Sequence, residues 1–226
     1  MKHFKLRTDL TIKVGEKTLY RIEATKDITK FGVKAGDLGG YIEKEENLSG
    51  DAWVSGDAKV YGNAYVSGNA YVSGDAEVYG DAWVCGNAEV YGKAEVSGNA
   101  EVYGDALVYG NARVSENAWV CGDARVSGDA KVYGDARVYG KAEVYGDKIE
   151  KENDLINITS NTKSYNITIT PEHIKIGCQY HSKTAWFKFT DNEIRKMDGE
   201  KAVMWWKTWK QILKQICDSF ASNKEE

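Results

Sequence analysis

A six-residue repeat constrains the fold of this chain more than any other feature. From residue 50 to residue 145 the pattern Gly-[Asp/Asn/Lys]-Ala-x-Val-[Tyr/Ser/Cys] occurs sixteen times without an insertion. Alanine fills every third position and valine every fifth, and the glycine is replaced only once, by Glu116. Ala-x-Val alternates apolar and variable positions, which is typical of a short strand with one face turned inward. Glycine beside Asp or Asn, which tolerate a left-handed backbone, favours a sharp corner between strands.

A strand this short cannot bury its apolar side by itself, so the repeats must stack on one another. Each strand can pair with the equivalent strand of the next coil, which encloses the alanines and valines in a shared interior. We therefore predict a parallel β-helix over residues 50–147. Because these side chains fill the interior, a binding site must lie on the outside, between subunits or in the end modules.

The repeat resembles that of the hexapeptide-repeat proteins, and residues 54–59, Val-Ser-Gly-Asp-Ala-Lys, fit the unit of that family as written. The resemblance implies a left-handed triangular helix with three repeats per turn, in which residues eighteen apart lie above one another. It also implies a homo-oligomer, a trimer or a dimer. The expected fold class is mainly β: this helix, an N-terminal β cap at residues 1–49 and a small C-terminal α+β module at residues 148–226.

The N-terminal segment is expected to cover the open end of the helix, where unpaired strand edges would otherwise be exposed. Residues 10–14 and 18–22 predict a β-hairpin around Gly15. Residues 36–49, together with residues 19–22, resemble an entry segment of hexapeptide-repeat proteins from bacteria and their phages. Such proteins are commonly labelled transferase-like or polymer-forming, so this resemblance informs the fold and carries little about function.

The composition changes after residue 147. Residues 148–161 suggest a linker or a loose strand, and residues 167–169 and 174–176 predict a hairpin. Thr-Asp-Asn-Glu at residues 190–193 has the form of a helix-capping box. The final segment, from residue 202, is an amphipathic helix, and its tryptophan-rich face must pack on the module and last coil or form a subunit interface. The tryptophans concerned are Trp205, Trp206 and Trp209.

Outward-facing aromatic residues are the best candidates for an interface with another copy or a partner. These are Trp53, Tyr65, Tyr71, Trp83 and Trp119, with Tyr103 beside the last two, while most other tyrosines are expected to stack along ladders. Acidic side chains gather in the middle coils (Glu77, Glu89, Glu95, Glu101) and basic ones in the later coils (Arg113, Arg125, Lys131, Arg137). The pattern suits a charge-paired surface, with Glu95 beside Arg113, or antiparallel self-association.

The repeats contain no histidine, which separates them from the enzymes that share this architecture. The acyltransferases that they resemble use a histidine base, and the related carbonic anhydrases bind zinc through three histidines. We therefore expect no catalytic residue and no cofactor. Outside the repeats, His173, Cys178 and His181 are weak candidates for a metal site with Cys217, or for a nucleophile and base, against the alternative that they are packing residues.

Charge and composition limit the partners. Residues 50–147 carry fifteen acidic and seven basic side chains, a net charge of −8, so we expect no nucleic-acid binding. No apolar run is long enough for a membrane span, and four unpaired cysteines predict free thiols in the cytoplasm.

Three functions remain open at this point. The first is a non-enzymatic structural or binding scaffold that self-associates, with specificity in the end modules. The second is a phage-encoded inhibitor or sponge that captures a host defence protein or a nucleotide signal. The third is a divergent hexapeptide acyltransferase.

Overall fold

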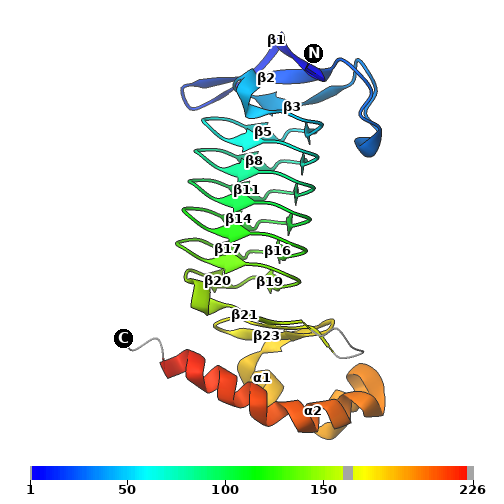
Figure 1. The fold of residues 1–226 in the computed structure, drawn as a ribbon, viewed down its shortest axis with the longest axis vertical. Coiled ribbons are helices and arrows are strands. Elements are labelled where there is room, and N and C mark those ends of the chain that lie inside the picture. The colour runs from blue at the N-terminus through cyan, green and yellow to red at the C-terminus, as the bar shows by residue number, and fades with distance from the viewer. Residues whose placement is uncertain (1, 160–164, 223–226) are drawn as a thin grey trace. The chain divides into compact units, whose positions relative to one another are not determined.

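The computed structural model describes residues 2–159 and 165–222, with the backbone alone for residues 220–222. The chain forms two compact units, Met1–Glu152 and Asn153–Glu226. The first unit is a β-solenoid and the second is a small sheet with helices (Figure 1). The mainly β fold class predicted from the repeat is confirmed.

Three parallel stacks of short strands form the walls of the solenoid. The first sheet contains β3 (Leu38–Ile42), β5 (Lys59–Val60), β8 (Glu77–Val78), β11 (Glu95–Val96), β14 (Arg113–Val114), β17 (Lys131–Val132) and β20 (Lys148–Ile149). The second contains β4 (Trp53–Val54), β7 (Tyr71–Val72), β10 (Glu89–Val90), β13 (Leu107–Val108), β16 (Arg125–Ser127) and β19 (Glu143–Tyr145). The third contains β6 (Tyr65–Val66), β9 (Trp83–Val84), β12 (Glu101–Val102), β15 (Trp119–Val120) and β18 (Arg137–Val138).

The stacking interval within these sheets is eighteen residues, as predicted. Glu95 pairs with Arg113 and Val96 with Val114 in parallel register. The backbone N–H of Glu95 donates to the carbonyl oxygen of Ala112 at 2.9 Å. The alanines and valines of all sixteen repeats are at most 1% exposed. Burial of these two positions in every repeat is therefore the main source of stability in the solenoid.

The corners of the coils depend on left-handed backbone. Gly86 has φ of 74°, and a Cβ there would lie 3.0 Å from the backbone N and O of Gly104 in the next coil. Glu116 adopts the same conformation, with φ of 62°, and is the one non-glycine residue with positive φ in the described part of the chain. The Asp and Asn residues beside the corner glycines do not adopt this conformation. Their side chains bond along the corner instead: Asn87 accepts from Asn69 at 3.2 Å and donates to Asp105 at 2.9 Å.

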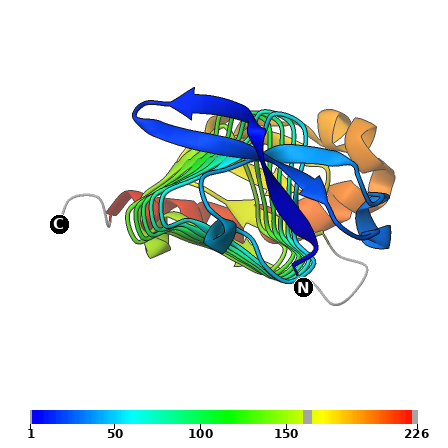
Figure 2. The same cartoon turned by 90° about the horizontal axis from the view of Figure 1, so that it is seen from above.

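The N-terminal strands extend the first sheet and cross the first coil (Figure 2). Strand β1 (Phe4–Val14) pairs antiparallel with β2 (Lys17–Ala24), which confirms the predicted hairpin and lengthens it. Strand β2 pairs antiparallel with β3, and β3 pairs in parallel with β5. Two short 3₁₀ turns, η1 (Thr29–Phe31) and η2 (Glu45–Asn47), complete this segment. The change from antiparallel to parallel pairing at β3 starts the solenoid.

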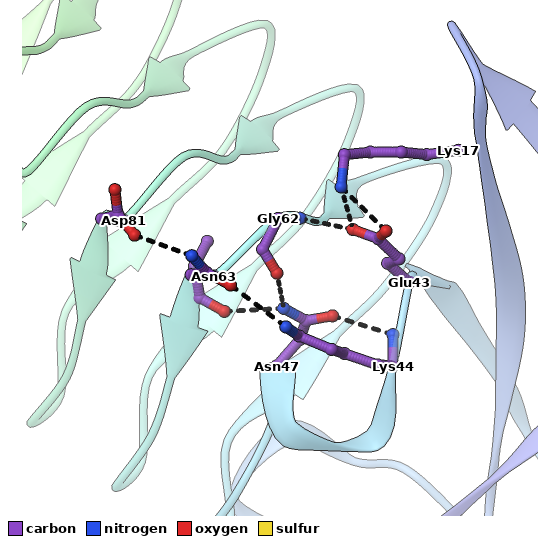
Figure 3. Close-up of polar contacts among 8 residues, drawn as sticks. Lys17, Glu43, Lys44, Asn47, Gly62, Asn63 and Asp81 are labelled. Carbon is purple, nitrogen blue, oxygen red and sulfur yellow. Dashed lines mark hydrogen bonds and ion pairs between the residues drawn. The ribbon is translucent and has the colours of Figure 1, made fainter.

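Polar side chains of the entry segment satisfy the backbone of the first coil (Figure 3). The buried amide of Asn47 donates to the carbonyl oxygens of Gly62 at 3.2 Å and Ala64 at 2.8 Å. Glu43 accepts from the N–H of Gly62 at 2.6 Å and from Lys17 at 2.8 Å. Leaving any of these polar groups unpaired in a buried position would destabilise the folded state.

The last rung of the solenoid corrects one expectation from the sequence. The sequence suggests a linker or loose strand at residues 148 and 149, but β20 pairs with β17 as the final strand of the first sheet. Lys131 pairs with Lys148, so the last coil is one residue shorter than the others. Ile149 is fully buried and takes the place of the repeat valine. Because the residues around Ile149 are polar, the sequence pattern does not indicate that its side chain is buried.

The C-terminal module is a four-stranded antiparallel sheet with two helices. Its strands are β21 (Ile156–Ile158), β22 (Ile167–Ile169), β23 (His173–Ile176) and β24 (Gln179–Ser182), preceded by η3 (Glu152–Asp154) and followed by α1 (Lys183–Lys188) and α2 (Asp191–Ser222). Pairing of β22 with β23 confirms the predicted hairpin. Thr190 and Glu193 form the predicted capping box through reciprocal hydrogen bonds. Helix α2 is broken at Asp198 and Gly199, where the backbone is not helical.

Candidate functional site

The outward side of the third sheet carries an exposed aromatic face, defined here as Tyr65, Trp83, Glu101, Trp119 and Arg137. Its three aromatic side chains are 37%, 46% and 36% exposed in sequence order. The rings of Tyr65 and Trp83 lie 6.3 Å apart, and the guanidinium of Arg137 lies 4.8 Å from the centroid of Trp119. Three large rings on one flat sheet form the kind of surface that marks an interface.

Charges on the first sheet are arranged differently from those on the aromatic face. In the first sheet Lys59 bonds Glu77 at 2.6 Å, and Arg113 bonds Glu95 at 3.2 Å. The predicted Glu95–Arg113 pair is therefore confirmed.

On the aromatic face Glu101 and Arg137 are separated by the rung of Trp119. Arg137 contacts Glu152 at 3.3 Å, on the solvent-exposed side. Exposed pairs of this kind contribute little free energy, so Arg137 retains capacity for a second carboxylate.

A second column of residues runs beside the aromatic face and contains Cys85, Tyr103 and Cys121. All are half-buried, and both cysteines are free thiols, as predicted. A hydrogen bond to Cys121, with burial, raises the pKa of Tyr103 to about 12. Burial raises the pKa of the Cys85 thiol, and Glu101 adds to this. Both groups are therefore neutral at physiological pH and leave Glu101 as the negative charge between the two tryptophans.

Trp53 and Tyr71 do not belong to an exposed surface, which corrects the expectation for Trp53. Its side chain is 1% exposed and lies beside the ring of His3, with centroids 6.3 Å apart. Tyr71 stacks on Phe31 at 4.7 Å and is half-buried. Both residues point away from the coil interior, but the N-terminal segment covers them. They serve to attach that segment to the second sheet.

Several other tyrosines stack between coils, as predicted for most of them. Tyr61 and Tyr79 are parallel with centroids 5.1 Å apart, and Tyr91 and Tyr109 are 5.0 Å apart. The tyrosines therefore contribute to cross-strand packing.

The three C-terminal tryptophans have different surroundings. Trp206 is 2% exposed and packs on Trp186 in the core of the module, with centroids 5.3 Å apart. Trp205 and Trp209 are half-buried and stack on each other at 5.5 Å. The helix face that they form is thus directed at least partly into its own module.

The weak metal candidates are not brought together. His173 stacks on Tyr180, whereas His181 lies edge-on to Trp186 and Phe189. In the register of β23 and β24, neighbours along a strand point to opposite sides, so the two histidines lie on opposite faces of the sheet. Burial lowers the pKa of His181. Across residues 2–159 and 165–219, no three His, Cys, Asp or Glu side chains are grouped to hold a metal ion.

One site escaped the sequence patterns. A pocket of about 230 Å³ lies in the C-terminal module at the break in α2, lined by residues that include Tyr165, Asp198, Trp205 and Trp206. Tyr165 precedes β22 and the other positions lie at or beyond the break, so no short motif unites them. The signal that could have indicated it is Asp-Gly at residues 198–199, which interrupts an otherwise helical pattern.

Comparison with known proteins supports the fold. A family model described as a YdcK beta solenoid repeat matches residues 106–122. These residues span one coil, from β13 to β15. No curated protein matches the chain. None of the described helices is long and apolar enough to cross a membrane. The chain is thus a β-solenoid repeat protein, and its function must be argued from its own surfaces.

Proposed function

We propose that this protein is a non-enzymatic scaffold whose solenoid self-associates, antiparallel, through the aromatic face. The observation that carries the proposal is the exposure of Trp119 on the third sheet, with Glu101 and Arg137 on either side of it. Burial of a half-exposed tryptophan contributes on the order of 1 kcal/mol, so burial of Trp119 from both copies favours a dimer. The end modules, whose surfaces do not repeat, would then provide specificity for other partners.

Charge complementarity selects the antiparallel orientation. A two-fold axis along the strand direction at the rung of Trp119 sets that ring against its own copy. The same operation sets Glu101 opposite Arg137 twice, once on each side of the axis. A parallel arrangement would instead oppose Glu101 to Glu101 and Arg137 to Arg137. Like charges directly opposite each other destabilise a sheet interface, so the antiparallel arrangement is preferred.

The first test is the mass of the protein in solution. Sedimentation equilibrium of the unmodified chain should show a dimer, and Trp119→Ala should weaken it by about tenfold or more, since tryptophans at the centre of interfaces are frequent hot spots. Leu107→Ala is the matched control, because Leu107 holds the outward position of the second sheet. This control should leave the dimer unchanged. A monomer at all concentrations for the unmodified chain would contradict the proposal.

A charge exchange tests the orientation. Glu101→Arg and Arg137→Glu should each weaken the dimer, because each creates two like-charge contacts across the axis. The double variant restores opposite charges and should recover much of the association. If the single variants associate as well as the unmodified chain, or if the double variant is no better than either, the antiparallel register is wrong.

Calorimetry with acetyl-CoA separates this scaffold from a divergent acyltransferase. The scaffold proposal predicts no heat of binding, because the coils contain neither a histidine nor an extruded loop. A saturable binding signal would favour the enzyme.

A further inference from the structure

The break in α2 creates a small pocket within the C-terminal module. At Gly199 the backbone has φ of 72° and ψ of −165°, so the helix direction changes between residues 197 and 202. Met197 lines the pocket from one side of the break, and Trp205 and Trp206 line it from the other. The volume of about 230 Å³ is below the range of roughly 300–1,000 Å³ typical of drug-sized sites. The pocket therefore suits a small ligand or the head of a larger one.

The lining of this pocket combines aromatic rings with one carboxylate. Tyr165 and Trp205 meet edge to face at 5.0 Å. Asp198 is the charged residue among those that line the pocket, and its carboxylate accepts from the Tyr165 hydroxyl at 2.6 Å. That hydrogen bond, together with Lys201 at 3.3 Å, lowers the pKa of Asp198 and keeps it ionised. A carboxylate beside aromatic faces attracts organic cations.

Trp206 provides two further observations. Its ring already attracts an ammonium group, since Nζ of Lys210 lies 5.7 Å from the ring centroid. Its indole Nε1 is buried and has no hydrogen-bond partner among the described atoms. That atom has almost no accessible surface, so it does not itself line the pocket. The pocket therefore offers a ligand the Asp198 carboxylate and aromatic rings.

We propose that this pocket binds a small organic cation that carries a methylated ammonium group. The ammonium group lies near Asp198, Tyr165 and Trp205. Methylation matters because a methylated ammonium is weakly hydrated and enters an aromatic site more readily than a primary amine. The proposal does not depend on self-association of the solenoid.

The test uses choline as the probe and 3,3-dimethylbutan-1-ol, its uncharged isostere, as the matched ligand. Titrations of the full chain are followed by calorimetry and by the NMR signal of the Trp206 indole N–H. Choline should bind at least about tenfold more tightly than the alcohol and should shift the indole signal, because the charge accounts for most of the affinity. Equal binding of the two ligands, or no choline binding, would overturn the proposal.

Two variants at the pocket mouth sharpen the test. Asp198→Asn keeps the side-chain shape and should reduce choline affinity by about tenfold, with no effect on the alcohol. Lys201→Gln removes the cation that competes for Asp198 and should strengthen choline binding. Equal thermal midpoints for these variants and the unmodified chain would show that the module remains folded. Unchanged choline affinity in Asp198→Asn would contradict the assigned role of the carboxylate.

Discussion

In the coils, residues that lie above one another are separated by about eighteen positions in the sequence. In the C-terminal module, the sequence separation between contacting residues follows no such rule. Val96 pairs with Val114 at the interval of eighteen residues that holds along the solenoid up to the last coil, which is one residue shorter. In the module, Tyr165 bonds Asp198 and Trp186 packs on Trp206. Repeated strand pairing produces long, uniform surfaces in which few positions differ from their neighbours. Selective recognition therefore requires the non-repeating parts, and extended association suits the coils.

The two regions also differ in how their interiors are filled. The solenoid interior consists of alanine and valine in identical layers, whereas the module core depends on a few large side chains. Loss of one layer in the solenoid leaves its neighbours in place. Loss of a tryptophan in the module removes a large share of the core.

Truncation of Trp206 should destabilise the module far more than the solenoid. Trp206→Ala is expected to cost about 3–5 kcal/mol, as for other buried aromatic residues. Hydrogen exchange should accelerate in β21–β24 and the helices, while the amides of the coils remain protected. Trp83→Ala, at an exposed position, is the control and should change stability by less than about 0.5 kcal/mol. Equal acceleration of exchange in both units would contradict the separation of their cores.

Substitution of a corner glycine should reveal how tightly the coils stack. Gly86→Ala forces a Cβ into left-handed backbone and against Gly104, so we expect a loss of at least about 2 kcal/mol. Gly15→Ala meets the same backbone strain with no atom within 4 Å and should cost about 1 kcal/mol. Denaturant midpoints measure both. Equal losses would mean that the crowding between coils carries no cost.

Acidification should loosen the attachment of the N-terminal segment. Nε2 of His3 donates to the carbonyl oxygen of Ala52, 2.7 Å away, and burial lowers the pKa of His3 below its usual 6.5. The unfolded state therefore binds more protons than the folded state as pH falls below 6.5. Stability from neutral His3 is complete above that pH and is lost progressively below it. Exchange of the β1 amides at pH 7.5 and 5.5 measures this, and His3→Gln should abolish the pH dependence. If the pH dependence persists in the variant, a titratable group other than His3 causes it.

Much of the fold could be predicted from the sequence because the same residue pattern occurs in every repeat. The hairpin around Gly15 and the capping box at Thr190 depend on residues close in sequence, and the eighteen-residue register is implied by the resemblance to hexapeptide-repeat proteins. Burial of Trp53 could not be predicted in this way, because it depends on distant residues near His3. The pocket at Asp198 could not be predicted either, because it depends on a contact between Tyr165 and Asp198, which are distant in the sequence.

The most direct test of the antiparallel association is a distance between two copies of the chain. Ser67 and Cys121 lie in the same column of the third sheet, three rungs apart, and each can carry a spin label in a chain whose other cysteines are replaced by serine. With the axis at the rung of Trp119, labels at residue 121 should lie within about 20 Å of each other, since stacked sheets pack at about 10 Å. Labels at Ser67→Cys should then be roughly 30 Å apart, at about 4.8 Å per rung. Equally short distances at both positions would show a parallel dimer and contradict the account.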